Sequence, residues 1–233
     1  MKPGNAFHSV IIPARAGSKS IVNKNLCKIG AKSLSEIAAY SAVNAGFFDE
    51  ILFSTDIESL LKQKFLGDKI NYFKRDDELC TDTAKMSDVV MDAIGKFKHK
   101  AHYIWVLQPT SPFRKRKDFL EIKEIIENEK PSSLISVRKC DSDHPNRTYT
   151  IVGDELKAIR FTNFENRQQL VPVYIRNGCF YVVRFEEFLV DRSFYLKPCR
   201  SYIMDKEHSV NIDSDMDLWT GRVLFDSKRV SYE

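Results

Sequence analysis

The strongest constraint on the fold is an alternation, over roughly the first 140 residues, between short apolar runs and longer segments of helical period. The short runs are rich in β-branched and aromatic residues, which favours strands. This alternation is typical of an α/β fold with a largely parallel sheet. It predicts strands at residues 9–13, 50–54, 69–74, 103–107 and 133–137, and helices at 33–45, 57–65, 85–97 and 115–129.

The helix at 33–45 has the clearest start, because Ser33-Leu34-Ser35-Glu36 matches a capping box. After about residue 140 the rhythm changes, and residues 149–161 predict a hairpin that turns at Gly153-Asp154. A strand at 201–204 and a closing helix at 215–225 complete the expected elements.

Composition limits the classes of protein to consider. The 233-residue chain is 43% apolar, so we expect a single domain over residues 1–233. Its 36 Lys and Arg exceed its 32 Asp and Glu only slightly and are mixed with them, which predicts no nucleic-acid or membrane partner. The five cysteines lack a CxxC spacing, and no segment approaches the roughly 20 apolar residues of a membrane span. We therefore expect a soluble, cytoplasmic protein without a zinc site or disulfides.

A basic loop follows the first predicted strand, where residues 12–19 are Ile-Pro-Ala-Arg-Ala-Gly-Ser-Lys. Gly17 and Ser18 let the backbone approach a ligand, while Arg15, Lys19 and Lys24 supply positive charge. Ligands of open α/β sheets lie at such strand ends. The loop therefore predicts a polyphosphate site, although it matches neither the P-loop nor the G-x-G-x-x-G pattern.

Further short motifs follow along the chain. They are Ser54-Thr55-Asp56, Arg75 with Glu78-Leu79, Asp82-Thr83-Ala84, Leu107-Gln108-Pro109-Thr110-Ser111-Pro112 with Arg114, His144-Pro145, Arg167-Gln168-Gln169-Leu170, Arg176-Asn177-Gly178 with Tyr181, Tyr202-Ile203-Met204, and Ile212-Asp213-Ser214 with Asp217. Two of them also suit structural roles, the first as a helix cap and the proline-rich one as a rigid turn. In this order, and with the basic loop and Lys24-Asn25-Leu26, the set resembles the N-acylneuraminate cytidylyltransferases, also called CMP-sialic acid synthetases.

The resemblance implies a Rossmann-like nucleotidyltransferase fold with a mostly parallel sheet. It also implies a homodimer in which a protruding segment of one subunit reaches over the active site of the other, and residues 140–175 are the candidate for that segment. The implied reaction transfers CMP from CTP to an acidic nine-carbon keto-sugar and releases pyrophosphate. N-acetylneuraminate, legionaminate and pseudaminate are all candidate sugars, since the sequence does not choose among them.

The resemblance also implies roles for individual residues. The residues implied to bind CTP are Ala14, Arg15, Gly17, Ser18, Lys24, Asn25, Arg75 and Asp82. Those implied to bind the sugar are Gln108, Arg167, Asn177, Tyr181, Phe194 and Tyr195. The catalytic set is Arg15, Lys19, Lys24 and Asp213.

Magnesium is the expected cofactor, because it prefers hard oxygen ligands and phosphate oxygens. Asp213, with Asn211, is the expected metal site. The family more often has two aspartates flanking an apolar residue, whereas this chain has Asn211-Ile212-Asp213. The asparagine keeps an oxygen ligand but loses a negative charge, so we expect a change in metal affinity or in the number of bound ions.

Two other functions remain open at this stage. One is the cytidylyltransferase for ketodeoxyoctulosonate, an eight-carbon acid sugar, whose family shares the Pro-Ala-Arg of the first loop but lacks the Gly-Ser-Lys and Lys-Asn-Leu found here. The other is a non-catalytic CTP-binding relative, which Asn211 suggests and which the complete set of basic loop residues disfavours.

Overall fold

A computed structural model describes residues 6–141, 144–159 and 170–232. These residues form a seven-stranded sheet in which every pairing is parallel except the two made by β10. The mostly parallel α/β sheet predicted from the sequence is therefore confirmed. Across the sheet the strands are β11 (Cys199–Met204), β7 (Ser133–Lys139), β10 (Tyr174–Arg184), β6 (Tyr103–Val106), β1 (His8–Ala14), β4 (Glu50–Thr55) and β5 (Asn71–Lys74).

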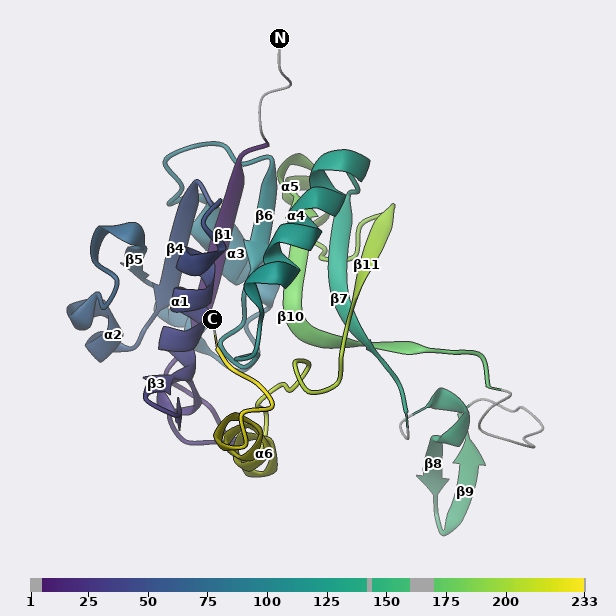
Figure 1. Ribbon diagram of the computed structural model, residues 1–233. Coiled ribbons are helices and arrows are strands. Elements are labelled where there is room, and N and C mark those ends of the chain that lie inside the picture. Colours follow the sequence, from purple (N-terminus) through teal and green to yellow (C-terminus); the bar gives the residue numbers. More distant parts are fainter. Residues whose placement is uncertain (1–5, 142–143, 160–169, 233) are drawn as a thin grey trace.

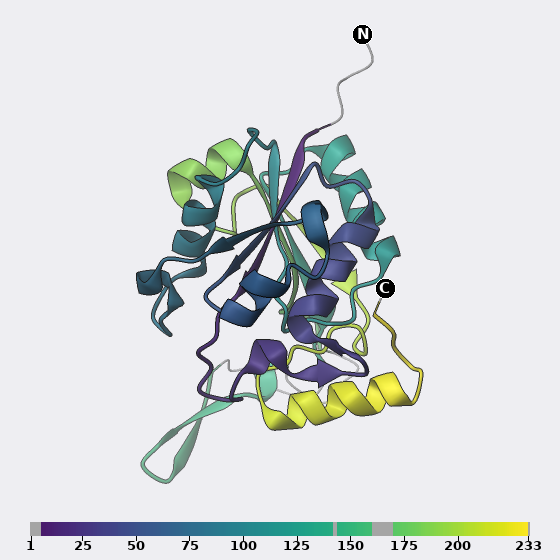
Figure 2. The ribbon, with the colours of Figure 1, turned by 90° about the vertical axis from the view of Figure 1, so that its left-hand side faces the viewer.

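Helices cover both faces of this sheet (Figures 1 and 2). α1 (Leu34–Ala45) and α4 (Arg116–Glu129) pack on one face, and α3 (Met86–Ile94) and α5 (Phe185–Asp191) pack on the other. Among the described residues, no helix is both long enough and apolar enough to cross a membrane. The remaining elements are η1 (Lys24–Leu26), β2 (Lys28–Ile29), β3 (Lys32–Ser33), α2 (Glu58–Gln63), η2 (Gly67–Lys69), η3 (Asp77–Cys80), η4 (Pro145–Arg147), β8 (Tyr149–Val152), β9 (Glu155–Ala158) and α6 (Asp215–Asp226).

Coverage of both faces explains why β1 is apolar almost throughout. Successive side chains of a strand point to opposite faces, so Val10 and Ile12 pack toward α1 and α4 while Ile11 packs toward α3 and α5. All seven residues of β1 are buried. A strand buried on both faces has this continuous apolar character rather than an alternating one.

The capping box predicted for α1 is present. The Ser33 hydroxyl accepts a hydrogen bond from the backbone N–H of Glu36 at 3.2 Å, and the Glu36 carboxylate accepts one from the Ser33 N–H at 2.7 Å. Gly46 ends the helix in the left-handed conformation, at φ 77°. The same reciprocal cap, between Ser214 and Asp217, begins α6.

The hairpin predicted at 149–161 is confirmed in its described part, as β8 and β9 with a turn at Gly153, φ 63°. These two strands pair with each other and project beyond the central sheet (Figure 1). The elements that were not predicted include β10 and α5, besides the two-residue strands β2 and β3 and the short 3-10 helices. The predicted helix at 85–97 is shorter than expected, because Gly95 caps α3.

Candidate active site

A cavity of about 250 Å³ lies at the carboxyl ends of β1 and β6, where the loops after these two parallel neighbours meet the segment before α6. Its walls combine the basic loop, the proline-rich turn after β6 and the pair predicted to bind metal. They are formed by Pro13, Arg15, Gly17, Ser18, Lys24, Asn25, Arg75, Met86, Gln108, Pro109, Thr110, Asn211 and Asp213.

Two side chains fix the basic loop in place. The Asp56 carboxylate accepts a hydrogen bond from the backbone N–H of Ala16 at 2.7 Å, and the Asn25 amide donates to the carbonyl of Arg15 at 2.8 Å. Asp56 therefore anchors the loop, while the N-cap of α2, Ile57, has no side-chain cap. Ala14, the last residue of β1, is buried and does not line the cavity.

The loop cations contact carboxylates. Arg15 and Lys19 both pair with Asp82, the latter at 3.0 Å, and Lys24 pairs with Asp213 at 2.9 Å. The hydrogen bonds from Arg15 and then Lys19 hold the pKa of the Asp82 carboxyl below its ordinary value. These positive groups thus already stabilise anionic oxygens, as phosphate binding would require.

Arg75 approaches the cavity from β5. Its guanidinium is 2% exposed and donates to the hydroxyl of Ser54 at 3.0 Å and to the carbonyl of Ser54 at 2.9 Å. Burial lowers its pKa from the ordinary value of arginine. These bonds to β4 hold the guanidinium rigidly against one wall of the cavity.

The predicted metal pair is arranged around a buried anchor. Ile212 is fully buried, and its N–H donates to the carbonyl of Thr110 at 2.7 Å. The two residues that flank Ile212 contact each other, because the amide of Asn211 donates to the Asp213 carboxylate. The amide oxygen of Asn211 in turn accepts a hydrogen bond from the Ser111 hydroxyl at 3.5 Å. The described residues contain no cluster of three His, Cys, Asp or Glu that would hold a metal unaided. One carboxylate and one amide oxygen suit Mg²⁺ when phosphate oxygens and water molecules complete the set of ligands.

Of the predicted sugar-site residues that the structure describes, Gln108 alone lines the cavity. Asn177 is 4% exposed; its amide donates to Ser209 at 2.9 Å and its oxygen accepts from Ser136 at 2.6 Å. Asn177 thus links β10 to β7 and to the segment before α6, and its sugar contact stays a prediction. Arg167 lies outside the described residues.

The three aromatic residues predicted for the sugar site lie elsewhere. Tyr181 packs among the core residues of the α3 and α5 face, with its ring 5.6 Å from that of Phe194. Phe194 also contacts Phe188, at 5.3 Å between ring centroids, and Tyr195 is 61% exposed. In this chain they form a core cluster and a surface position rather than a cavity wall.

Several residues that line the cavity are not among the site residues predicted from the sequence. Pro13, Pro109, Thr110 and Met86 line the cavity. The first three lie beside predicted residues in the same motifs, so proximity was an available signal. Met86 starts α3, and its position opposite the basic loop depends on tertiary packing alone.

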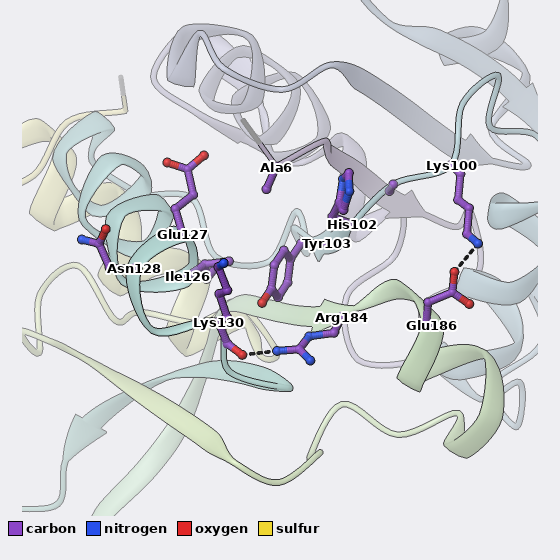
Figure 3. A pocket seen from close by; sticks show the side chains of 11 residues that line it. Ala6, Lys100, His102, Tyr103, Ile126, Glu127, Asn128, Lys130, Arg184 and Glu186 are labelled. Carbon is purple, nitrogen blue, oxygen red and sulfur yellow. Dashed lines mark hydrogen bonds and ion pairs between the residues drawn. The ribbon is translucent and has the colours of Figure 1, made fainter. Parts of the chain in front are cut away.

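A second and larger cavity, of about 950 Å³, lies at the opposite edge of the sheet, beside the start of β6 and the end of α4. Figure 3 shows two of its charged side chains in contact with neighbours, with Arg184 donating to the carbonyl of Lys130 and Lys100 paired with Glu186. The Tyr103 hydroxyl likewise donates to the carbonyl of Pro131 at 3.1 Å. We find no convergence of unpaired polar groups among the described residues lining it.

Comparison with known proteins agrees with the geometry. The model of a family described as cytidylyltransferase matches residues 9–196. An N-acylneuraminate cytidylyltransferase of Streptococcus agalactiae serotype V is 31% identical over 223 residues, which are 93% of this chain and 53% of that protein. The chain thus spans about half the length of that relative.

A second relative matches over nearly its full length. The CMP-N,N'-diacetyllegionaminic acid synthase of Legionella pneumophila is 29% identical over 215 residues, covering 89% of this chain and 91% of that protein. Among solved structures, a CMP:2-keto-3-deoxy-manno-octonic acid synthetase complexed with CTP superposes with a TM-score of 0.69, covering 96% of this chain and 100% of the other. At 14% identity, this last similarity establishes a shared fold.

Proposed function

Because the chain belongs to the cytidylyltransferase family, we propose that it transfers CMP from CTP to the anomeric hydroxyl of a nonulosonic acid. The observation that carries the proposal is the convergence of Arg15, Lys24 and Arg75 on one cavity at the carboxyl ends of β1 and β6. The names of the relatives, which specify N-acylneuraminate and diacetyllegionaminic acid, support an acidic nine-carbon keto-sugar as acceptor.

In this reaction the sugar hydroxyl oxygen bonds to the α-phosphorus of CTP as the bond from that phosphorus to pyrophosphate breaks, and the hydroxyl proton passes to water. Such transfers depend mainly on positioning and charge neutralisation. Arg15, Lys19 and Lys24 would exchange their present carboxylate partners for phosphate oxygens. Gln108, on the neighbouring strand end, would contact the sugar.

Magnesium is part of the proposal. Asp213 and the amide oxygen of Asn211 would hold the ion together with phosphate oxygens, a donor set that fits its preference for hard ligands. When bound, Mg²⁺ supplies further neutralisation of phosphate charge. Asp213 already contacts Lys24 at 2.9 Å, so the ion and the lysine would act on the same phosphates.

We also propose a homodimer held together through the hairpin. Ile151 and Leu156 are 73% and 68% exposed on a two-stranded sheet that has no further strand to cover it in the described structure. An isolated hairpin of this kind is marginally stable, and exposed apolar patches mark protein contacts. A second copy of the chain would bury these residues. The predicted sugar ligand Arg167 belongs to the same segment.

The dimer is tested by sedimentation of an Ile151→Ser, Leu156→Ser double variant. We expect it to sediment as a monomer, while a Val190→Ser control, altered at a residue of α5 that is 81% exposed, keeps the mass of a dimer. A double variant that remains dimeric would contradict the assignment.

We propose that the reaction takes place in the cytoplasm, a reducing compartment in which five free cysteines would stay thiols. The function is tested by incubating the purified protein with CTP, Mg²⁺ and a panel of acidic keto-sugars and measuring pyrophosphate. We expect release with at least one nine-carbon acid. Release with the eight-carbon acid alone, or with none, would overturn the proposed function.

A further inference from the structure

Arg114 is a fully enclosed cation beside the candidate active site. Its side chain is 1% exposed and donates three hydrogen bonds, to the carbonyls of Gln108 at 2.6 Å, Ser111 at 2.7 Å and Cys179 at 2.7 Å. The ring of Phe180 lies 5.6 Å from the guanidinium carbon. All three acceptors belong to the backbone, two in the turn after β6 and one in β10.

The charge of Arg114 is costly to bury. Burial lowers its pKa to about 10, so the guanidinium remains protonated at neutral pH. Within the described part of the chain it forms no salt bridge, and the nearby Asp118 carboxylate accepts instead from the Tyr202 hydroxyl at 3.0 Å and the Lys115 N–H at 2.9 Å. Without the guanidinium, the three carbonyls would lose a hydrogen-bond donor, which is costly for buried polar groups. The arginine therefore stabilises the turn after β6 and β10 and also fixes the distance between them.

The three carbonyls belong to segments that shape the cavity. β10 changes register between Arg176 and Tyr181, and within this bulge Gly178 adopts φ 78°. A Cβ atom on Gly178 would lie 3.3 Å from the amide oxygen of Gln108 and 3.4 Å from that of Asn211. The bulge thus passes directly behind both side chains, and its position relative to the turn determines how they lie.

The same turn also positions the proposed metal loop, because the carbonyl of Thr110 accepts a hydrogen bond from the N–H of Ile212 at 2.7 Å. Arg114 holds the residues on both sides of Thr110, namely Gln108 and Ser111. Together with the bond from Ile212 to Thr110, the guanidinium therefore helps to set the spacing between Gln108 and Asp213.

We propose that Arg114 is a positioning residue of the transfer reaction, which holds Gln108 and the Asn211-Ile212-Asp213 loop in register by linking the turn after β6 to the bulge of β10. This inference rests on the proposed function, in which Gln108 faces the sugar and Asp213 faces the metal. Misplacement of reacting groups by about 1 Å can cost on the order of 10²-fold in rate.

The test compares Arg114→Met and Arg114→Lys with a control at a more exposed arginine, Arg184→Met, whose side chain is 37% exposed and pairs with Glu187 at 3.0 Å. Arg184 also donates to a backbone carbonyl, that of Lys130, and also lies over an aromatic ring, that of Tyr103, at 6.0 Å. It sits at the opposite edge of the sheet, beside the larger cavity. For each protein we would measure the melting temperature, kcat, both Michaelis constants and amide hydrogen exchange.

For Arg114→Met we expect kcat to fall by about 10- to 100-fold with the CTP Michaelis constant changed by less than about threefold. Arg114→Lys should give an intermediate kcat, since an ammonium keeps the charge but lacks the planar fork of donors. Arg184→Met should keep its kcat. A lower melting temperature with unchanged kcat in Arg114→Met would overturn the inference.

Hydrogen exchange separates this inference from the proposed function. We expect faster exchange at the amides of Ser111 and Ile212 in Arg114→Met and not in Arg184→Met, whether or not the sugar panel yields product. A wild-type protein that is inactive with every sugar would refute the function alone. Unchanged exchange at these two amides would refute the role of Arg114.

Discussion

The two edges of the central sheet offer cavities of opposite character. The carboxyl edge has the smaller one, about 250 Å³, whose walls include three cations and the two proposed metal ligands from segments far apart in the sequence. The amino edge has one of about 950 Å³, in which Arg184 donates to a backbone carbonyl and Lys100 pairs with Glu186 (Figure 3). Convergence of charge, and not volume, therefore distinguishes the candidate active site.

The difference follows from how a parallel sheet is built. At the carboxyl edge the loops after β1 and β6 lie side by side, since these strands are parallel neighbours, and each loop directs polar groups to the same place. At the amino edge, helix ends and strand starts meet, and their polar groups satisfy one another. His8 is an example, with Trp105 donating to one ring nitrogen at 3.1 Å and Glu127 lying 3.4 Å from the other.

The largest effect on activity is expected from the removal of a cation that lines the smaller cavity. Replacing Lys24 by Met removes a positive charge whose side chain is 15% exposed and which contacts Asp213. We expect kcat/KM for CTP to fall by roughly 10²- to 10³-fold, the usual effect of deleting one preorganised electrostatic contact. Lys100→Met, at the amino edge, should stay within about twofold of wild type. Equal losses of kcat/KM in the two variants would contradict the assignment of CTP binding to the carboxyl edge.

An intermediate effect is expected from restoring the missing carboxylate. Asn211→Asp places a second negative charge beside Asp213, so the Mg²⁺ concentration at half-maximal rate should fall by about 3- to 10-fold, given the dependence of cation affinity on ligand charge. A magnesium titration of both proteins at fixed CTP measures this. Coincident midpoints would mean that Asn211 does not face the ion.

The smallest effect concerns the amino edge and appears in stability alone. Burial lowers the pKa of His8 below its ordinary value of 6.5, so the folded protein favours the neutral ring. The unfolded chain then binds more protons, and the stability contributed by His8 is present above pH 6.5 and lost as the pH falls below it. Denaturant unfolding between pH 7.5 and 5 should show a flatter pH dependence for His8→Gln than for wild type. Identical slopes would exclude His8 as the titrating group.

Local sequence patterns predicted much of the sheet. β1, β4, β6 and β7 are short apolar runs flanked by helices, and the cap of α1 depends on residues three positions apart. The basic loop was located correctly because its position follows from the end of β1. In each case the residues that determine the local structure lie within a few positions of the element itself.

β10 could not be predicted in this way. Its first half carries Arg176, Asn177 and Gly178, which interrupt any strand pattern, and its antiparallel partners lie in β6 and β7, far away in the sequence. The bulge fixes which face each following residue occupies. Phe180 packs with α1 and α4, and Tyr181 packs with α3 and α5. The predicted sugar role of Tyr181 could not be judged without that register.

Hydrogen–deuterium exchange with and without CTP and Mg²⁺ tests the central claim most directly, because it locates the ligand on one edge of the sheet. We predict protection in residues 15–26 and 108–114, which surround the smaller cavity, and unchanged exchange in residues 100–103 and 126–130, which surround the larger one. Protection confined to the second pair of segments would place the nucleotide at the amino edge and contradict the account.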